Sequence, residues 1–214
     1  MYVPKSFEET REDVLHALIR AHPLGALVSG GADSLDANHI PFLLKAGAAG
    51  TVLHAHVARA NPVWRTFESH ARVLVIFQGM EAFITPSWYA TKRETGKMVP
   101  TWNYAVVHAH GSVRLHPEPE WLRRHVGELT DSREAGRAEP WRVEDAPADF
   151  IEKLVGAIVG LEITVERLTG KWKLSQNQAA RDREGVVAGL AGEDGDDARA
   201  MSEWIRQSLA EKTS

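Results

Sequence analysis

Two histidines at 54 and 56 are the first residues in the sequence whose types and spacing suggest chemistry. On a β-strand His54 and His56 share one face, because side chains alternate between the two faces. Imidazoles in this pattern can bind a metal ion, but such a site needs a third and usually a fourth ligand. His108 and His110 would supply them if their strand lay beside the first.

The same stretch supports a second interpretation, a pocket for a phosphate group. Asn61-Pro62 is typical of a helix start, with asparagine at the cap and proline at the first helical position. The first N–H groups of a helix lack internal partners and carry partial positive charge. Arg59 directly before them would add a full charge. Alternatively, Arg59 is a surface arginine and Asn61 only a cap.

Aromatic and polar side chains also alternate in three later segments, 83–89, 100–104 and 171–178. In the first, the hydroxyls of Thr85 and Ser87 lie beside Trp88, an arrangement that suits a flavin ring; packing of a barrel end would explain it equally well. In the second, a buried Asn103 would need partners, so it either binds a ligand or braces the fold. In the third, Ser175 or Asn177 would cap the helix that follows.

The bulk composition narrows the classes of function. The 214 residues are 43% hydrophobic and 25% charged, with a formal net charge of −4, which gives no global attraction to nucleic acid or an anionic membrane. The absence of cysteine excludes disulfides, thiolate metal sites and a cysteine nucleophile. No segment has the apolar length of a membrane span or the pattern of a signal peptide, so we expect a cytoplasmic protein. Dinucleotide, P-loop, zinc-protease, nucleophile-elbow and helix-turn-helix patterns are missing.

The elements that must position these residues are mostly short strands. Ser6 and Glu9 form a capping-box pattern that predicts a first helix ending at His22-Pro23. Strands are expected over 24–29, 37–45, 51–57, 72–78, 81–85, 99–115 and 159–168, with turns at 30–33 and 46–50, a short helix after Asn61 and a polar insertion at 90–97. Helices are expected over 119–130, 148–157, 177–190 and 197–209. This order predicts a mainly β fold with added helices, built around a small closed barrel.

Several of these segments together resemble the FMN-binding negative transcriptional regulator family, the PaiB-like proteins. The resemblance runs in order across about residues 1 to 180, and the last thirty or so residues look variable. It rests on Met1-Tyr2-Val3-Pro4 with Phe7, His56-x-Ala58-Arg59-x-Asn61-Pro62, Phe77-Gln78-Gly79, Ile84-Thr85-Pro86-Ser87-Trp88-Tyr89, Val99-Pro100-Thr101-Trp102-Asn103-Tyr104 and Lys173-Leu174-Ser175-Gln176-Asn177.

The resemblance implies an FMN-binding split β-barrel, similar to pyridoxamine-phosphate-oxidase-like proteins, in a homodimer with the flavin at the subunit interface. It implies a single domain over 1–214 with helical additions at about 118–157 and 177–212. The implied function is negative regulation of transcription, direct or indirect; the alternative is an FMN-dependent oxidoreductase or a haem-handling enzyme on the same barrel. Direct DNA binding has no support in the net charge. The implied cofactor-binding residues are His56, Arg59, Asn61, Thr85, Ser87, Trp88, Thr101, Trp102, Asn103, Lys173, Ser175, Gln176 and Asn177.

Overall fold

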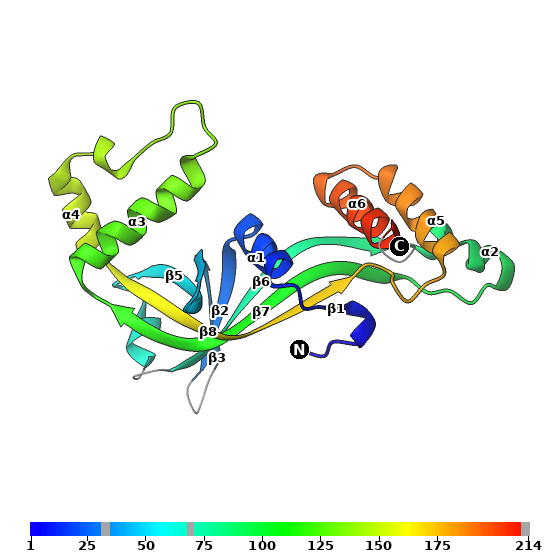
Figure 1. Cartoon of the computed structure of the whole chain (residues 1–214), viewed down its shortest axis with the longest axis horizontal. Helices are drawn as coiled ribbons and strands as arrows, with labels where there is room; N and C mark the ends of the chain where they lie inside the picture. The colour runs from blue at the N-terminus through cyan, green and yellow to red at the C-terminus, as the bar shows by residue number, and fades with distance from the viewer. Residues whose placement is uncertain (31–34, 68–70, 211–214) are drawn as a thin grey trace. The chain divides into compact units, whose positions relative to one another are not determined.

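The protein folds into two compact units that are built from interleaved parts of the chain. The computed structural model describes residues 1–30, 35–67 and 71–210 (Figure 1). The first unit comprises residues 1–18, 78–107 and 169–214, and the second comprises residues 19–77 and 108–168. No helix within the described ranges is long and apolar enough to cross a membrane.

An antiparallel sheet is the framework of the second unit. Among the described residues the sheet has eight strands, in the order β3-β2-β6-β7-β8-β5-β4, and β1 pairs separately with β8. Contacts between β3, the first strand of this order, and β5, the last but one, bring its two sides together. The strands are β1 (Glu8–Glu9), β2 (Leu24–Gly30), β3 (Leu35–Pro41), β4 (Leu43–Gly47), β5 (Gly50–Ala58), β6 (Arg72–Ile84), β7 (Thr101–His116) and β8 (Ile158–Lys173).

The strands form where apolar residues recur at every second position. In β6, Val73, Val75 and Phe77 are buried while the residues between them are half-buried or exposed. The same alternation buries Leu27 in β2 and Leu53 in β5, since one face of each strand turns inward. These side chains fill the barrel core, whose burial is the main stabilising contribution to the second unit.

Helices close one end of the second unit. The short 3-10 helix η2 (Pro62–Thr66) follows β5, and α3 (Pro119–Glu134), η4 (Val143–Asp145) and α4 (Ala148–Gly156) separate β7 from β8. In Figure 1, α3 and α4 lie side by side, joined by a long connection. Trp121 and Leu122 of α3 pack with Val155 of α4 in a small apolar cluster.

The first unit carries the ends of the three longest strands and most of the remaining helices. These helices are η1 (Lys5–Phe7), the start of α1 (Glu12–Ala21), η3 (Pro86–Trp88), α2 (Ala90–Thr95), α5 (Ala180–Ala191) and α6 (Asp196–Ala210). Trp172 of β8 stacks on Trp204 of α6, with ring centroids 5.7 Å apart. Helix α5 comes so close to Trp88 that a Cβ at Gly185 or Gly189 would overlap it.

Several sequence-based expectations need correction. The strand expected at 37–45 is two strands, β3 and β4. Neither Ser175 nor Asn177 caps the helix that follows, because the N-cap of α5 is Ala179 and no side chain caps it. The capping box at Ser6 is wrong: Glu8–Glu9 is the strand β1, paired with β8, and the Glu9 carboxylate accepts from the Arg11 backbone N–H at 2.9 Å, just before α1 begins. The polar insertion at 90–97 contains a helix, α2. The strands expected at 72–78 and 81–85 are one strand, β6. Of the turn expected at 30–33, residues 31–33 lie outside the described residues.

Candidate functional site

The predicted phosphate corner lies where β5 ends and η2 begins, in the second unit. Asn61 caps η2 as expected, since its Oδ1 accepts from the Val63 N–H at 2.9 Å. Its Nδ2 donates to Oδ1 of Asn38 in β3 at 2.8 Å, which fixes the side chain in one orientation. The Trp64 indole N–H donates to the Arg59 carbonyl at 3.1 Å and braces the corner from the other side.

Arg59 provides the positive charge of this corner. Its Nε donates to the Gly156 carbonyl and its Nη2 to the Ile158 carbonyl, both at 3.0 Å. These two bonds hold the guanidinium plane at the end of α4. They use two of the five N–H groups that an arginine has. Because η2 is a 3-10 helix of five residues, its dipole adds little, and the fixed guanidinium is the main attraction for an anion.

His56 belongs to a cluster of histidines that sequence reasoning did not find. His56 Nδ1 lies 3.1 Å from Nε2 of His125 in α3, so one ring donates to the other. Burial and the neighbouring His56 and His54 lower the pKa of His125 to about 3. Burial also lowers the pKa of His56. Neutral rings at this position let α3 cover the barrel without burying charge.

The rest of this cluster surrounds Trp121. His116 stacks on Trp121 with ring centroids 4.4 Å apart, and Trp121 stacks on His125 at 5.2 Å. His54 Nε2 and His116 Nε2 lie 3.3 and 3.6 Å from the same Glu162 oxygen. We name His54, His56, His116, His125 and Trp121 the histidine cluster. His116 and His125 come from outside the strand that carries His54, so spacing along the chain gave no signal for them.

The structure does not bring together the four histidines of the metal alternative, His54, His56, His108 and His110, because β8 lies between the two strands that carry them. His54 and His56 contact His125, whereas His108 and His110 contact each other, with ring centroids 6.4 Å apart. Within residues 1–30, 35–67 and 71–210, no group of three or more His, Asp or Glu side chains is arranged to hold a metal ion.

Ten of the predicted site residues lie in the first unit, and Lys173 organises several of them. Its ammonium donates to the Thr101 hydroxyl and to the Trp102 carbonyl, which holds the start of β7 against the end of β8. Burial and, after it, Lys171 lower the pKa of Lys173. The Trp102 indole is 52% exposed and meets the half-exposed ring of Phe83 edge to face at 5.8 Å.

Asn103 and Ser175 are buried behind this surface and bond to each other. The Asn103 amide nitrogen donates to the Ser175 hydroxyl at 2.9 Å, and Ser175 also interacts with the buried Tyr89 phenol. Ser175 has a φ of 60°, in the left-handed region. Asn103 and Ser175 both bond to protein groups, so the contacts in the structure are those of residues that brace the fold.

The remaining predicted residues are structural or exposed. Thr85 caps η3 by accepting from the Ser87 N–H at 3.3 Å. Gln176 folds back on its own turn, accepting from the Leu174 N–H at 2.6 Å. Asn177 and Ser87 are exposed. Thr85 and Trp88 also line a shallow hollow of about 600 Å³. Five carboxylates share its lining: Glu81, Glu193, Asp194, Asp196 and Asp197. Their negative charge would repel a phosphate group.

Taken separately, a surface of the first unit and a corner of the second each have chemistry that suits one part of FMN. A flavin ring needs a flat apolar surface with a few hydrogen-bond donors, and Trp102 with Phe83 and Lys173 provides one. A phosphate needs a fixed cation, which Arg59 provides. When bound, a flavin supplies hydride and electron transfer.

Comparison with known proteins agrees with this chemistry. The family model described as "Putative FMN-binding domain" matches residues 1–167. An uncharacterized protein of Emericella nidulans is 32% identical over 243 residues, covering 97% of each chain. Protease synthase and sporulation protein PAI 2 of Bacillus subtilis is 31% identical over 209 residues, covering 98% of each chain.

Among solved structures, the FAD and heme binding protein from Mycobacterium smegmatis has a similar fold. Its TM-score is 0.60 at 18% identity, and the match covers 85% of this chain and 80% of the other. At that identity the likeness concerns the fold alone. The chain therefore belongs to the putative FMN-binding domain family, the PaiB-like proteins with a split-barrel fold, and its cofactor is FMN.

Proposed function

We propose that the protein is a cytoplasmic, homodimeric flavoprotein that binds FMN at the subunit interface and acts as a negative regulator of transcription, directly or indirectly. The observation that carries the flavin site is the exposed indole of Trp102 beside an ammonium group, Lys173, that two oxygen atoms hold in place. An exposed tryptophan next to a positioned donor is suited to a planar ring with polar edges.

The Arg59 corner is proposed to bind the FMN phosphate. Charge-assisted bonds from a guanidinium are among the strongest that a surface site can offer an anion. Because two carbonyls already hold Arg59, little side-chain entropy is lost when a phosphate binds. Phosphate binding at the Arg59 corner and ring binding at the Trp102 surface are two separate predictions, tested by Arg59→Ala and Trp102→Ala.

A role in regulation is supported by kinship with Protease synthase and sporulation protein PAI 2, which is named for two cellular processes. The net charge of −4 favours an indirect route, through the flavin or a partner, over a large electrostatic contact with DNA. Dimer formation is supported by the exposed apolar side chains Phe83, Val99 and Trp102, which a second copy would cover.

The second candidate is an enzyme on the same barrel, an FMN-dependent oxidoreductase or a haem-handling protein. Kinship of fold with a protein named for FAD and heme binding supports it. Reduction of the bound flavin by NADH or NADPH with turnover would favour this candidate. A flavin that stays oxidised in their presence would favour the regulatory one.

The absorption spectrum of the freshly purified full-length protein tests the flavin site. We expect a flavin spectrum in the wild type, and weaker FMN binding in Trp102→Ala than in Trp141→Ala. Trp141 is the matched control because its side chain is 46% exposed and lies outside the predicted set. Equal FMN affinity in the two variants would remove Trp102 from the site. Analytical ultracentrifugation tests assembly, and a flavin-loaded monomer would contradict the interface.

A further inference from the structure

The histidine cluster lies where α3 meets the barrel, within the second unit. His125 of α3 and His56 of β5 form the 3.1 Å contact between Nε2 and Nδ1. Trp121, one turn earlier in α3, lies so close to Gly160 of β8 that a Cβ there would overlap its indole ring. Aromatic and imidazole rings therefore hold α3 against two strands of the sheet.

The contact between His56 and His125 has room for one proton only. One of the two nitrogens donates and the other accepts, because a second proton would set two N–H groups against each other. The other nitrogen of His125, Nδ1, is buried and has no hydrogen-bond partner in the described part of the chain. A proton added to His125 must therefore enter the contact with His56 or go to a buried nitrogen without an acceptor, and both are unfavourable.

The charges around His125 also oppose a proton there. Titratable side chains surround the cluster from β4, β5, β7, β8 and α3 with its N-cap: Lys45, His54, His56, His116, Glu118, Glu128 and Glu162. Glu128 pairs with Lys45, and the other two carboxylates face His54 and His116. Burial, followed by the charges of His56, His54 and Lys45, lowers the pKa of His125 to about 3. A proton on His125 would thus be buried next to side chains that are, or can become, positive.

Helix α4 links α3 to the Arg59 corner. Trp121 and Leu122 of α3 pack against Val155 of α4. The next residue, Gly156, ends α4, and its carbonyl accepts from Arg59 Nε at 3.0 Å. The position of the guanidinium therefore depends on where α4 ends, and α4 in turn packs on α3.

We propose that the histidine cluster is an acid-sensitive switch that controls the release of FMN. Protonation of His125 moves α3 away from β5, α4 follows α3, and Arg59 loses a carbonyl that holds its guanidinium. The phosphate then leaves the corner. This inference rests on the proposed binding of the FMN phosphate by Arg59, and it adds a regulator of that site, the proton.

The linkage between protonation and opening sets the size of the effect. The pKa of His125 is about 3 in the closed form, and it returns to 6.5 when α3 moves away and the ring meets water. Between pH 7 and pH 5 the ratio of open to closed protein then rises about 25-fold. FMN that leaves from the open form dissociates faster by the same factor.

Hydrogen exchange of the full-length, FMN-loaded protein at pH 7 and pH 5 tests the movement of α3. After correction for the intrinsic effect of pH on exchange, protection of the α3 amides should fall about 25-fold in the wild type, while the buried start of β6 keeps its protection. His125→Gln should show no such fall, because glutamine does not take up the proton. Equal losses in α3 and β6, or a fall in α3 that persists in His125→Gln, would overturn the proposal.

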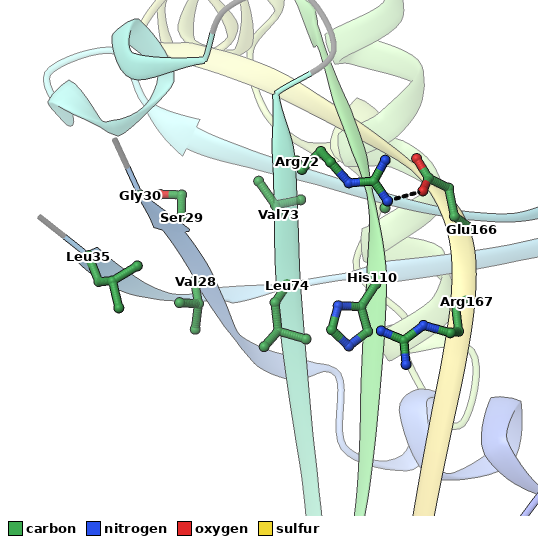
Figure 2. A pocket seen from close by; sticks show the side chains of 11 residues that line it. Val28, Ser29, Gly30, Leu35, Arg72, Val73, Leu74, His110, Glu166 and Arg167 are labelled. Atoms are coloured by element: carbon green, nitrogen blue, oxygen red, sulfur yellow. Dashed lines mark hydrogen bonds and ion pairs between the residues drawn. The ribbon is translucent and has the colours of Figure 1, made fainter. Parts of the chain in front are cut away.

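His110 of β7 supplies the matched control. In Figure 2 its ring lies beside Leu74 and Arg167, and the described residues around it all belong to strands. Burial, followed by the charge of Arg167, lowers the pKa of His110 as well. His110→Gln therefore removes another titrating histidine of the same unit without changing the contacts of α3, and its α3 amides should respond to acid as in the wild type.

The rate of FMN release, followed by flavin fluorescence after dilution, tests the consequence for the cofactor. The FMN phosphate itself takes up a proton near pH 6, which speeds release from every variant. Beyond this shared effect, release from the wild type and His110→Gln should rise about 25-fold more than release from His125→Gln. Equal acceleration in all three would overturn the switch. Arg59→Ala at pH 7 tests the phosphate site alone: unchanged FMN affinity there would contradict the proposed function, whatever α3 does.

Discussion

Replacing the buried His125 with glutamine should make the protein's stability less sensitive to acid. His125 is a buried residue of α3, 1% exposed, and its Nε2 lies 3.1 Å from Nδ1 of His56 in β5. Glutamine does not titrate in this range but can still bond to His56. The substitution therefore removes the proton-binding group while keeping a polar side chain at the same place.

The expected magnitude follows from the pKa of His125, which its surroundings lower from 6.5 to about 3. Between these values the unfolded chain binds a proton that the folded chain does not, so stability falls as the pH drops below about 6.5. Above that pH both states are neutral at this residue and its contribution is constant. At pH 5 the folded state loses about 2 kcal/mol relative to pH 7 through this residue alone.

Urea unfolding of the wild type and His125→Gln at pH 7 and pH 5 measures this effect. The wild type should lose about 2 kcal/mol more than the variant over this interval. His39→Gln, which changes an exposed histidine of β3, is the matched control and should retain the wild-type pH dependence. Equal slopes for wild type and His125→Gln would refute the idea that α3 buries a neutral imidazole at His125.

Three further predictions follow from individual contacts. Arg59→Ala should weaken FMN binding by about 1.5–3 kcal/mol, measured by flavin fluorescence titration, whereas Arg65→Ala in the adjacent short helix η2 should not. Gly189→Ala should lower the melting temperature because its Cβ would overlap Trp88, whereas Gly127→Ala, with open space around it, should not. Asn103→Ala should cost about 1–3 kcal/mol of unfolding free energy, because it removes the buried hydrogen bond between Asn103 and the Ser175 hydroxyl; an unchanged urea midpoint would count against that bond.

The sequence predicts most strands of the barrel because the alternation of apolar and polar residues in a strand can be seen within a few neighbouring positions. The alternation around Val73, Val75 and Phe77 predicts a strand there, and the structure has one. The cap at Asn61 was predicted for the same reason, since its partner Val63 is two residues away. Where a local signal competed with a distant one, as at Glu9, the distant pairing with β8 prevailed.

The candidate site was less predictable because its contacts join residues far apart in sequence. Lys173 and Thr101 are 72 positions apart, as are Asn103 and Ser175, and no spacing rule connects them. Resemblance to a family identified them as a group, but it did not indicate which of them bond to one another. The pairing of His56 with His125 depends on how α3 lies on β5, which residue types alone do not specify.

The left-handed backbone at Ser175 has a consequence for how this position tolerates change. Holding a residue other than glycine at a φ of 60° costs about 1–2 kcal/mol. Glycine would remove that cost but also the hydroxyl to which Asn103 donates, a loss of similar size. The two effects nearly cancel, so replacing Ser175 with glycine would change the melting temperature very little. The Asn103 amide, however, would lose the hydroxyl that fixes its orientation. Serine at this position therefore fixes the orientation of the Asn103 amide and contributes little to thermal stability.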